Sequence, residues 1–531
     1  MPSTFALRDR DVRYEIPSVP ARFARKEAPI KSRLLVLLLL LIGPALVRSA
    51  PDAQAEAQPG GSTTLASVAS DGTQGNSASF EPAISAGGHV VAFVSSATNL
   101  VPDDKPCATE TGFVNCDDVF LRDRASGETM LISIASDGTQ ANSHSGSPSI
   151  SGDGQVVAFY SHATNLVADD TNRFCRDFED KLHNCADIFV HDRQAARTTR
   201  VSVASDGAQA NHGSVMPTIS TDGRFVAFYS YATNLVDGDA NNYCTDERGQ
   251  VANCPDIFVH DRLTGATELV SVASDGAQAN HRSFVPTISA DGRYVAFVSE
   301  ATNLVDGDSN GKEDVFVHDR ESGATIRVSV ASDGSEAQGE SDYPAISADG
   351  RFVAFVSDAP NLAGGDANGT YDVFVHDTQT GMTTRISVAS DGSEGDRIST
   401  HPSISAEGRF VSFSSQATNL ASDNPHRCGD VVPTQPCFDV FVHDRWTGTT
   451  HLVSAASDGT PGDRRSGGSS ISADGRSIAF SSDSTNLVSG DNNVYCPGRF
   501  GYTNCPDVFV REWKPAPSFP IALPLLQRPS E

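Results

Sequence analysis

The chain has 531 residues, of which 39 are Lys or Arg and 67 are Asp or Glu, so its formal net charge at pH 7 is −28. Nucleic acid and anionic lipid require a positive protein surface, so this charge disfavours both partners and leaves cations and proteins. Gly is frequent (44) and Met is rare (4), a composition that favours short strands and turns over long helices. The length exceeds one ordinary core, so we expect several domains or one closed repeat architecture.

The first 55 residues have the pattern of an export segment. A basic stretch over residues 22–33 precedes the apolar run 34–47, and residues 53–55 read Ala-Gln-Ala, which suits a signal-peptidase site. The apolar run is shorter than the roughly 20 residues that span a bilayer, so a cleaved signal is favoured and an uncleaved anchor is the alternative. We predict residues 1–55 to be the export segment and the rest to be secreted, periplasmic or at the cell surface.

One tetrapeptide, Ala-Ser-Asp-Gly, occurs seven times along the chain at intervals of 58 to 69 residues. Each copy belongs to a unit of four short segments that are rich in β-branched and aromatic residues and are separated by glycine turns. In the fourth unit these segments cover residues 286–289, 293–299, 314–320 and 325–331. The repeat predicts an all-β fold, a seven-bladed β-propeller of four-stranded antiparallel blades.

The last unit has no fourth strand of its own. Its third segment continues directly into the Pro-rich residues 514–531, which we expect to form a flexible tail. Residues 62–69 have the sequence of a fourth strand and precede every first strand. We therefore predict that residues 62–69 complete the last blade, residues 469–511, and that the propeller covers residues 62–513.

The repeated segments also resemble a known family. Ile288–Phe297 reads Ile-Ser-Ala-Asp-Gly-Arg-Tyr-Val-Ala-Phe, and residues 314–319 read Asp-Val-Phe-Val-His-Asp. This pattern resembles the TolB-type repeat, a WD40-like propeller, over residues 62–513. The resemblance implies the propeller fold and, for TolB itself, a periplasmic partner of the Tol–Pal envelope system and six blades behind a separate α/β domain. This chain departs from that pattern, because it has seven repeats and no such domain.

All ten cysteines lie between the second and third segments of five units, as pairs 9 or 10 residues apart. In an exported chain, paired cysteines at equivalent positions predict five local disulfides. Thiol metal ligation is the disfavoured alternative, because no C-x-x-C occurs. The predicted pairs are Cys107–Cys116, Cys175–Cys185, Cys244–Cys254, Cys428–Cys437 and Cys496–Cys505.

The fourth and fifth units have no cysteines, and the fourth has a candidate cation loop instead. Residues 306–314 fit D-x-D-x-N-G-x-x-D, a spacing that can wrap oxygen ligands around a hard cation. The other interpretation is a polar turn, because Asp, Asn and Gly are common turn residues. In the fifth unit Gly364 replaces the first ligand, so weaker binding is expected there. The predicted Ca²⁺ ligands are the Asp306, Asp308, Asn310 and Asp314 side chains and the Lys312 carbonyl.

The connections differ in length within each unit. Those between first and second and between third and fourth segments are short turns, whereas the long connections share the opposite face, which we call the loop face. Loops on a rigid scaffold commonly carry function, and a specific site must use residues that do not repeat. The candidates for a ligand face are Glu81, Asp342, Arg397 and His401.

Two functions fit these features. The favoured interpretation is a non-catalytic, secreted or envelope-associated propeller that binds a protein or a glycan through a loop face stabilised by a cation and by disulfides. The alternative is a glycan-active hydrolase or lyase at the channel mouth, with carboxylates such as Glu81 and Asp342. We expect a monomer that binds no nucleic acid and that touches a membrane only through an uncleaved N-terminal segment.

Overall fold

The computed structural model confirms the all-β prediction. The predicted export segment 1–55 and residues 515–531 of the predicted tail lie outside the described residues. Within the described part of the chain there is no helix long and apolar enough to cross a membrane. The structure describes residues 61–109, 112–114, 116–172, 175–176, 182–239, 241, 244–245, 251–421, 437–491 and 505–514.

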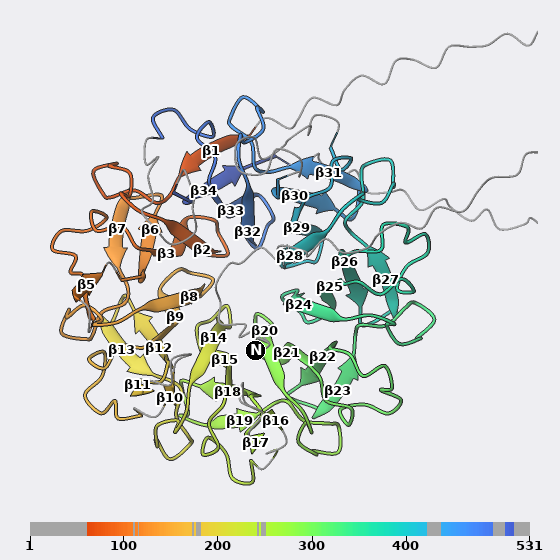
Figure 1. Ribbon diagram of the computed structural model, residues 1–531, viewed down its shortest axis with the longest axis horizontal. Helices are drawn as coiled ribbons and strands as arrows, with labels where there is room; N and C mark the ends of the chain where they lie inside the picture. The colour runs from red at the N-terminus through yellow and green to blue at the C-terminus, as the bar shows by residue number, and fades with distance from the viewer. Residues whose placement is uncertain are drawn as a thin grey trace, which may run out of the picture. The chain divides into compact units, whose positions relative to one another are not determined.

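Seven four-stranded antiparallel sheets form a ring of blades (Figure 1). Blades 1 and 2 consist of β2 (Ser79–Ile84), β3 (Val90–Ser95), β6 (Asp118–Asp123) and β7 (Glu128–Leu131), and of β8 (Ser145–Ile150), β9 (Val156–Ser161), β12 (Asp187–Asp192) and β13 (Arg197–Arg200). Blades 3 and 4 consist of β14 (Ser214–Ile219), β15 (Phe225–Ser230), β18 (Asp256–Asp261) and β19 (Thr267–Leu269), and of β20 (Ser283–Ile288), β21 (Tyr294–Ser299), β22 (Asp314–Asp319) and β23 (Ala324–Arg327).

The remaining blades follow the same order. Blades 5 and 6 consist of β24 (Ser341–Ile346), β25 (Phe352–Ser357), β26 (Asp372–Asp377) and β27 (Met382–Arg385), and of β28 (Ser399–Ile404), β29 (Phe410–Ser415), β30 (Asp439–Asp444) and β31 (Thr449–Leu452). Blade 7 consists of β32 (Ser466–Ile471), β33 (Ser477–Ser482), β34 (Asp507–Glu512) and β1 (Ser62–Leu65). Three short hairpins are β4 (Cys107–Thr109) with β5 (Gly112–Val114), β10 (Cys175–Arg176) with β11 (Leu182–His183), and β16 (Cys244–Thr245) with β17 (Val251–Ala252).

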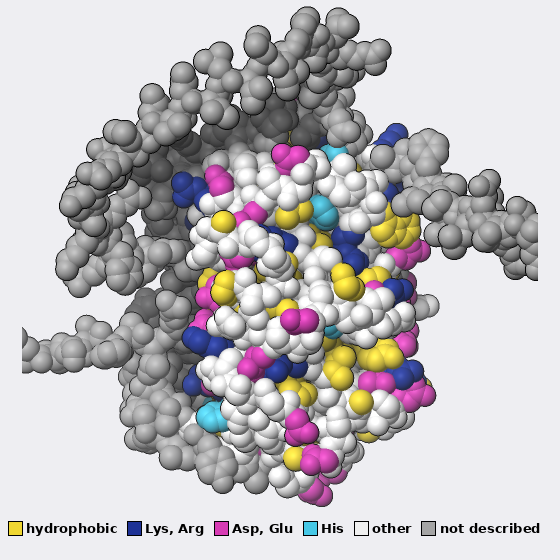
Figure 2. Space-filling model, turned by 90° about the vertical axis from the view of Figure 1, so that its right-hand side faces the viewer, with side chains coloured by type: hydrophobic (Ala, Val, Ile, Leu, Met, Phe, Trp, Pro, Cys, Tyr) yellow, Lys and Arg dark blue, Asp and Glu magenta, His cyan; other side chains and the backbone are white. Residues whose placement is uncertain are grey.

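The core lies between the blades, because the middle strands are apolar on both faces. In blade 4, Phe297 and Phe316 stack with their ring centroids 6.0 Å apart, and a corresponding pair occurs in every blade. Phe297 also belongs to a buried cluster with Ala227 and Val259 of blade 3. Each blade therefore buries its faces against its neighbours. On the side seen in Figure 2, acidic and basic side chains are interspersed among uncharged polar and hydrophobic ones.

A circle of backbone hydrogen bonds links the turns between first and second strands. The amide N–H of one turn donates to the carbonyl of the next blade's turn, as Ala290 does to Ala348 at 3.0 Å. The series includes all seven blades, because Ala473 N–H donates to Ala86 of blade 1 at 3.0 Å and Ala86 N–H donates to Gly152 of blade 2 at 3.1 Å. These bonds fix the end of the ring opposite the loop face.

β1 lies where the other blades have their fourth strand. It pairs antiparallel with β34, with Ser62 opposite Glu512 and Leu65 opposite Phe509. This is the partner that the sequence indicates for residues 62–69. How much this strand contributes to keeping the ring closed stays a prediction, which deletion of the strand tests.

Candidate binding site around the propeller axis

The first strand of every blade carries a β-bulge. Its pairing with the second strand shifts between the second and fifth residues of the first strand. The third residue has a positive φ, which glycine adopts freely and other residues adopt only at a cost of about 1–3 kcal/mol. We call these seven positions the bulge ring, and its members are Glu81 (φ 52°), Ser147 (φ 46°), Met216 (φ 52°), Val285 (φ 50°), Tyr343 (φ 50°), His401 (φ 51°) and Gly468 (φ 60°).

The bulge ring encircles the axis on the side of the loop face. β2, β8, β14, β20, β24, β28 and β32 are the innermost strands (Figure 1). Each begins directly after a loop of the loop face, and the bulge comes three residues later, whereas the hydrogen-bonded turns follow the strand's other end. The bulge residues are thus placed by the scaffold at the axial end where the long loops gather.

The side chains of the bulge ring do not repeat, although their backbone geometry does. Blades 3 to 6 contribute a continuous run of apolar and aromatic residues: Met216, Val285, Tyr343 and His401. The rings of Tyr343 and His401 lie with centroids 4.4 Å apart. Burial lowers the pKa of His401 to about 4, so at neutral pH the imidazole is uncharged and the pair is an aromatic platform.

Glu81 is the acidic member of the bulge ring. It is buried, and its Oε2 accepts a hydrogen bond from the backbone N–H of Ser147 in the neighbouring blade at 2.8 Å. Burial raises the pKa of Glu81 to about 7, the nearby Asp117 charge raises it further, and the Ser147 hydrogen bond opposes both. The carboxyl group therefore changes its protonation near neutral pH.

The structure places two of the four predicted ligand-face residues at equivalent positions of the bulge ring. Glu81 and His401 occupy the same position in blades 1 and 6. Asp342 precedes the bulge and is buried, and its Oδ1 accepts a hydrogen bond from the N–H of Tyr343 at 2.7 Å, so it supports the backbone of the bulge ring. Arg397 is exposed on a loop before β28 and is not a member of the bulge ring.

Sequence reasoning missed the other members of the bulge ring. Ser147, Met216, Val285 and Tyr343 carry no charge that attracts notice. The available signal was positional, because the first and last residues of the first strand repeat, as does the fourth in six blades, while the second and third residues do not. Only the bulge, which interrupts the regular alternation of a strand, reveals that these positions share one place around the axis.

The predicted cation loop of blade 4 contributes to one of the two acidic clusters that, among the described residues, could hold a metal ion. Asp308 and Asp314 converge as predicted, and Glu336 joins them. Arg327 extends from β23 into the same cluster, with Nη1 2.6 Å from Glu336 Oε1, 3.4 Å from Asp314 Oδ2 and 3.5 Å from Asp308 Oδ1. A guanidinium thus compensates these carboxylates.

The remaining predicted ligands act within the turn. Asn310 Nδ2 donates to Asp314 Oδ2 at 2.9 Å, and Asn310 Oδ1 accepts from the Lys312 N–H at 2.8 Å. Asp306 is exposed at the start of the loop. The amide of Asn310 therefore presents a donor to Asp314, as an ordinary turn residue does.

Blade 5 repeats this cluster without an aspartate at the position of Gly364. Arg385 lies 2.6 Å from Glu394, 3.5 Å from Asp372 and 3.9 Å from Asp366. Two blades therefore contain the same arrangement of three carboxylates and one guanidinium.

The recurring aspartate at the start of each third strand is a structural cap. In blade 3, Ser271 Oγ donates to Asp256 Oδ1 at 2.7 Å, and Gln278 Nε2 donates both to Asp256 Oδ2 at 2.9 Å and to Asp239 Oδ1 at 2.8 Å. Burial raises the pKa of Asp256 to about 7, and the Asp239 charge contributes. The same serine bond recurs in blade 1 between Ser133 and Asp118 at 2.6 Å.

These caps predict a pH-dependent stability. The folded protein holds the Asp256 proton more tightly than the unfolded chain, so its favourable contribution is full at low pH and is lost as the pH rises from about 4 to about 7. The melting temperature should fall between about pH 4 and pH 7, and Asp256→Asn should flatten this dependence. Melts across this pH range test it, with the exposed turn residue Asp275 changed to Asn as control. An equal slope in Asp256→Asn and wild type would contradict the assignment.

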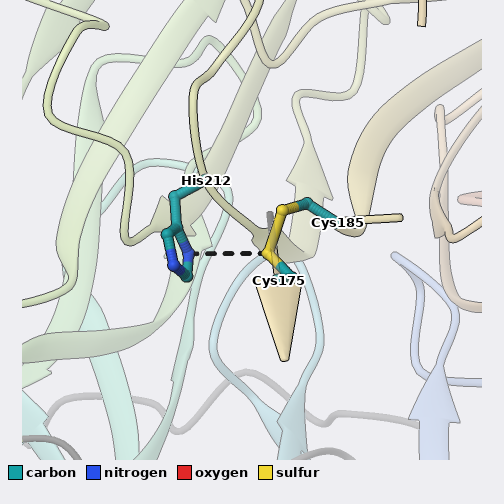
Figure 3. A group of neighbouring side chains, drawn as sticks. All are labelled: Cys175, Cys185 and His212. Carbon is teal, nitrogen blue, oxygen red and sulfur yellow. Dashed lines mark hydrogen bonds between the residues drawn. A yellow bond between two sulfur atoms is a disulfide. The ribbon is translucent and has the colours of Figure 1, made fainter. Parts of the chain in front are cut away.

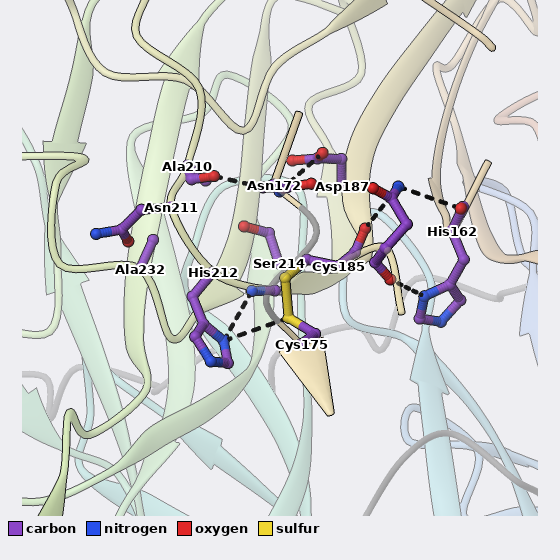
Figure 4. Close-up of a disulfide and its surroundings, with 12 residues drawn as sticks. His162, Asn172, Cys175, Cys185, Asp187, Ala210, Asn211, His212, Ser214 and Ala232 are labelled. Atoms are coloured by element: carbon purple, nitrogen blue, oxygen red, sulfur yellow. Dashed lines mark hydrogen bonds between the residues drawn. A yellow bond between two sulfur atoms is a disulfide. The ribbon is translucent and has the colours of Figure 1, made fainter. Parts of the chain in front are cut away.

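Two predicted disulfides are confirmed. Cys175–Cys185 and Cys244–Cys254 are bonded, each with a Cα–Cα distance of 5.0 Å. Figure 4 shows the first beside the buried Asn172, whose Nδ2 donates to the cap Asp187 at 3.1 Å. Each disulfide therefore closes a loop next to a cap.

The three other predicted disulfides are only partly described. Three of their cysteines are disulfide-bonded, and their predicted partners have side chains outside the described residues. Non-reducing peptide mapping should link each cysteine to its near neighbour. The bonded residues are Cys116, Cys437 and Cys505, and the predicted partners are Cys107, Cys428 and Cys496.

A histidine lies against the blade 2 disulfide. His212 Nδ1 is 3.7 Å from Cys175 Sγ (Figure 3), and the three side chains form a cluster with the composition of a metal site. Both sulfur atoms belong to the disulfide, however, so neither is a thiolate ligand in this state. The cluster is explained by the disulfide.

Comparison with known proteins finds similar solved structures and no related sequence. No protein-family model and no curated protein sequence matches it. An oligogalacturonate lyase in complex with manganese is 13% identical, with 87% of this chain and 96% of that chain covered and a TM-score of 0.47. TolB from Acinetobacter baumannii is 15% identical, with 63% and 58% covered and a TM-score of 0.34.

A third propeller is similar to the same degree. The β-propeller domain of the Trilobed protease from Pyrococcus furiosus is 10% identical, with 82% of this chain and 95% of that chain covered and a TM-score of 0.46. The propeller fold that the TolB-type resemblance implies is present in the seven four-stranded blades themselves.

Proposed function

We propose that this protein is a non-catalytic propeller that binds a protein or a glycan at the axial end of its loop face. The bulge ring is the observation that carries the proposal. Seven blades repeat one backbone geometry there, yet they present seven chemically different residues. Six of these retain a strained conformation that glycine, as at Gly468, would relieve. Strain maintained at varied side chains is typical of a binding site.

The disulfides support an extracytoplasmic location. Disulfides persist in oxidising compartments and are rare in the cytosol. The export pattern of residues 1–55 also indicates a location outside the cytoplasm. We propose that the protein is secreted, periplasmic or attached to the cell surface, where it meets its ligand.

Binding of labelled protein to the envelope fraction of the source organism tests the function. Tyr343→Ala should weaken binding at least about tenfold, because it removes half of the aromatic platform. Trp446→Ala is the matched control, since Trp446 is 55% exposed on a turn between third and fourth strands, away from the loop face. Equal binding by wild type and Tyr343→Ala would refute the proposal.

A glycan-active hydrolase or lyase is the second candidate, and Glu81 is the observation that favours it. A carboxyl group with a pKa of about 7 suits general acid or base catalysis at neutral pH. Incubation with glycans should then release new reducing ends or unsaturated sugars, and Glu81→Gln should abolish the release. If the protein only binds glycans, the wild type leaves the added glycans intact.

Calcium binding in blade 4 is part of the proposal. Because Arg327 already compensates Asp308 and Asp314, a Ca²⁺ ion there must displace its guanidinium. Thermal melts with Ca²⁺ and with chelator test this for wild type and Asp308→Ala. A Ca²⁺-dependent shift that is lost in Asp308→Ala would support the site, and equal melts in wild type would exclude it.

A further inference from the structure

Blades 6 and 7 lack an apolar side chain just before the bulge. The second residue of the first strand pairs with the fifth residue of the second strand, and blades 1 to 5 have at least one apolar side chain of valine size or larger in this pair. Blade 6 has Thr400 opposite Ser414, and blade 7 has Gly467 opposite Ser481. The pairs in the other blades are Phe80–Val94, Gly146–Tyr160, Val215–Tyr229, Phe284–Val298 and Asp342–Val356.

The two glycines at this position have different surroundings. A Cβ at Gly146 would lie 2.9 Å from the Tyr160 ring, so the tyrosine fills that space. At Gly467 a Cβ would meet only Ser414, with its Oγ at 3.4 Å and its Cβ at 4.0 Å, which is ordinary van der Waals contact. Blade 7 therefore leaves room that blade 2 occupies.

Three buried hydroxyl groups lack hydrogen-bond partners, and all lie at this level of the ring. They are the only such hydroxyls in the described part of the chain, namely those of Ser147, Ser414 and Ser481. Ser414 as a residue is 3% exposed. Buried polar groups almost always have partners, so each of these hydroxyls can still bond to a water molecule or to a ligand.

Two of these hydroxyls, those of Ser414 and Ser481, lie in blades 6 and 7, and blade 7 has the one position of the bulge ring without a side chain. Gly468 contributes no side chain, and its neighbours in the ring are His401 of blade 6 and Glu81 of blade 1. We call the sector over Gly467 and Gly468, between these two side chains, the blade 7 sector. It has an aromatic platform on one side and a carboxyl group on the other.

We propose that the blade 7 sector binds a neutral sugar unit, a proposal that rests on the function proposed above. An aromatic platform suits the C–H face of a sugar ring, and serine hydroxyls, which both donate and accept, suit its hydroxyl groups. An acidic sugar would be repelled by the Glu81 carboxylate and by the net charge of −28. Gly467 and Gly468 leave this part of the ring without side chains, where blade 3 has Val215 and Met216.

An array of neutral and uronic-acid oligosaccharides tests this. Wild type should bind neutral members. Gly467→Val/Ser481→Tyr copies the Val215–Tyr229 pair of blade 3 and should weaken binding at least about tenfold by filling the space. Blade 4, which follows blade 3, has Phe284 as the second residue of its first strand, and blade 1, which follows blade 7, has Phe80 there. The transferred pair therefore faces a phenylalanine in both places.

Ser414→Ala is the second variant, because it removes one unpartnered hydroxyl without adding bulk. It should weaken binding about fivefold without lowering the melting temperature. Ser126→Tyr, on an exposed turn, is the control and should bind like wild type. Unchanged binding in both Ser414→Ala and the filled variant would overturn the proposed sector, and preference for uronic acids would overturn the neutral sugar.

The envelope assay separates this inference from the function on which it rests. If protease removes the envelope signal and periodate, which cleaves sugar diols, does not, the ligand is a protein and the sugar inference is wrong while the binding function stands. If Tyr343→Ala does not affect the envelope signal, the binding function itself fails.

Discussion

Replacing Arg327 by Leu should lower the free energy of unfolding by about 3–5 kcal/mol, because it leaves Asp308, Asp314 and Glu336 without their only close cation in the described structure. The Arg327 side chain is only 9% exposed, so water compensates little of this loss. Chemical denaturation at pH 7 measures the change.

The other blades supply a matched rescue. Blade 3 has Leu269 where blade 4 has Arg327, and Gln278 where blade 4 has Glu336, and the Gln278 amide bridges two aspartates. The double variant Arg327→Leu/Glu336→Gln should therefore recover at least about half of the loss. An Arg327→Leu variant as stable as wild type, or a double variant no better than the single one, would contradict this account of the cluster.

Deleting residues 62–69 should cause the second large effect. The deletion removes the β1–β34 ladder and the bond from Ser67 Oγ to Asp507 Oδ1 at 2.6 Å, and it exposes the edge of β34. We expect a lower melting temperature and association of the protein through the free edge. Thermal melts with light scattering measure both, and a monomer with the wild-type melting temperature would refute the contribution of β1 to closure.

A point variant separates the contacts of β1 from the effect of shortening the chain. Thr63 Oγ1 donates to the Ala455 carbonyl at 2.5 Å and accepts from Arg511 Nη1 at 3.0 Å, both in buried surroundings. Thr63→Val should cost about 1 kcal/mol, because it removes both hydrogen bonds, although Arg511 Nη1 still donates to the Ala455 and Ala456 carbonyls. The neighbouring Thr64 is exposed, so Thr64→Val is the matched control and should change stability little.

The fold was predictable because the repeated unit determines it. Seven copies of one four-segment unit can bury their faces only against each other, so the blade number and the strand order followed from counting. The partner of segment 62–69 was predictable because the last unit lacks a fourth strand, and β1 does pair with β34. The two described disulfides followed from equivalent positions.

The site was less predictable, because its parts are distant in the sequence. Arg327 and Glu336 meet Asp314 only across the sheet and the following turn, so a loop motif could not include them. Met216 and Tyr343 share a position in the bulge ring only because a bulge occurs in each blade. Glu81 and His401 were found because charge that does not repeat stands out in a repeated sequence.

Site-specific photocrosslinking tests the central claim, that the ligand binds at the bulge ring. Benzoylphenylalanine placed at Tyr343 or at Trp446 inserts into C–H bonds of proteins and sugars alike, so the ligand need not be known beforehand. Irradiation on the envelope fraction should give a crosslinked product from position 343 and none from position 446. A product from position 446 with none from position 343 would contradict the account.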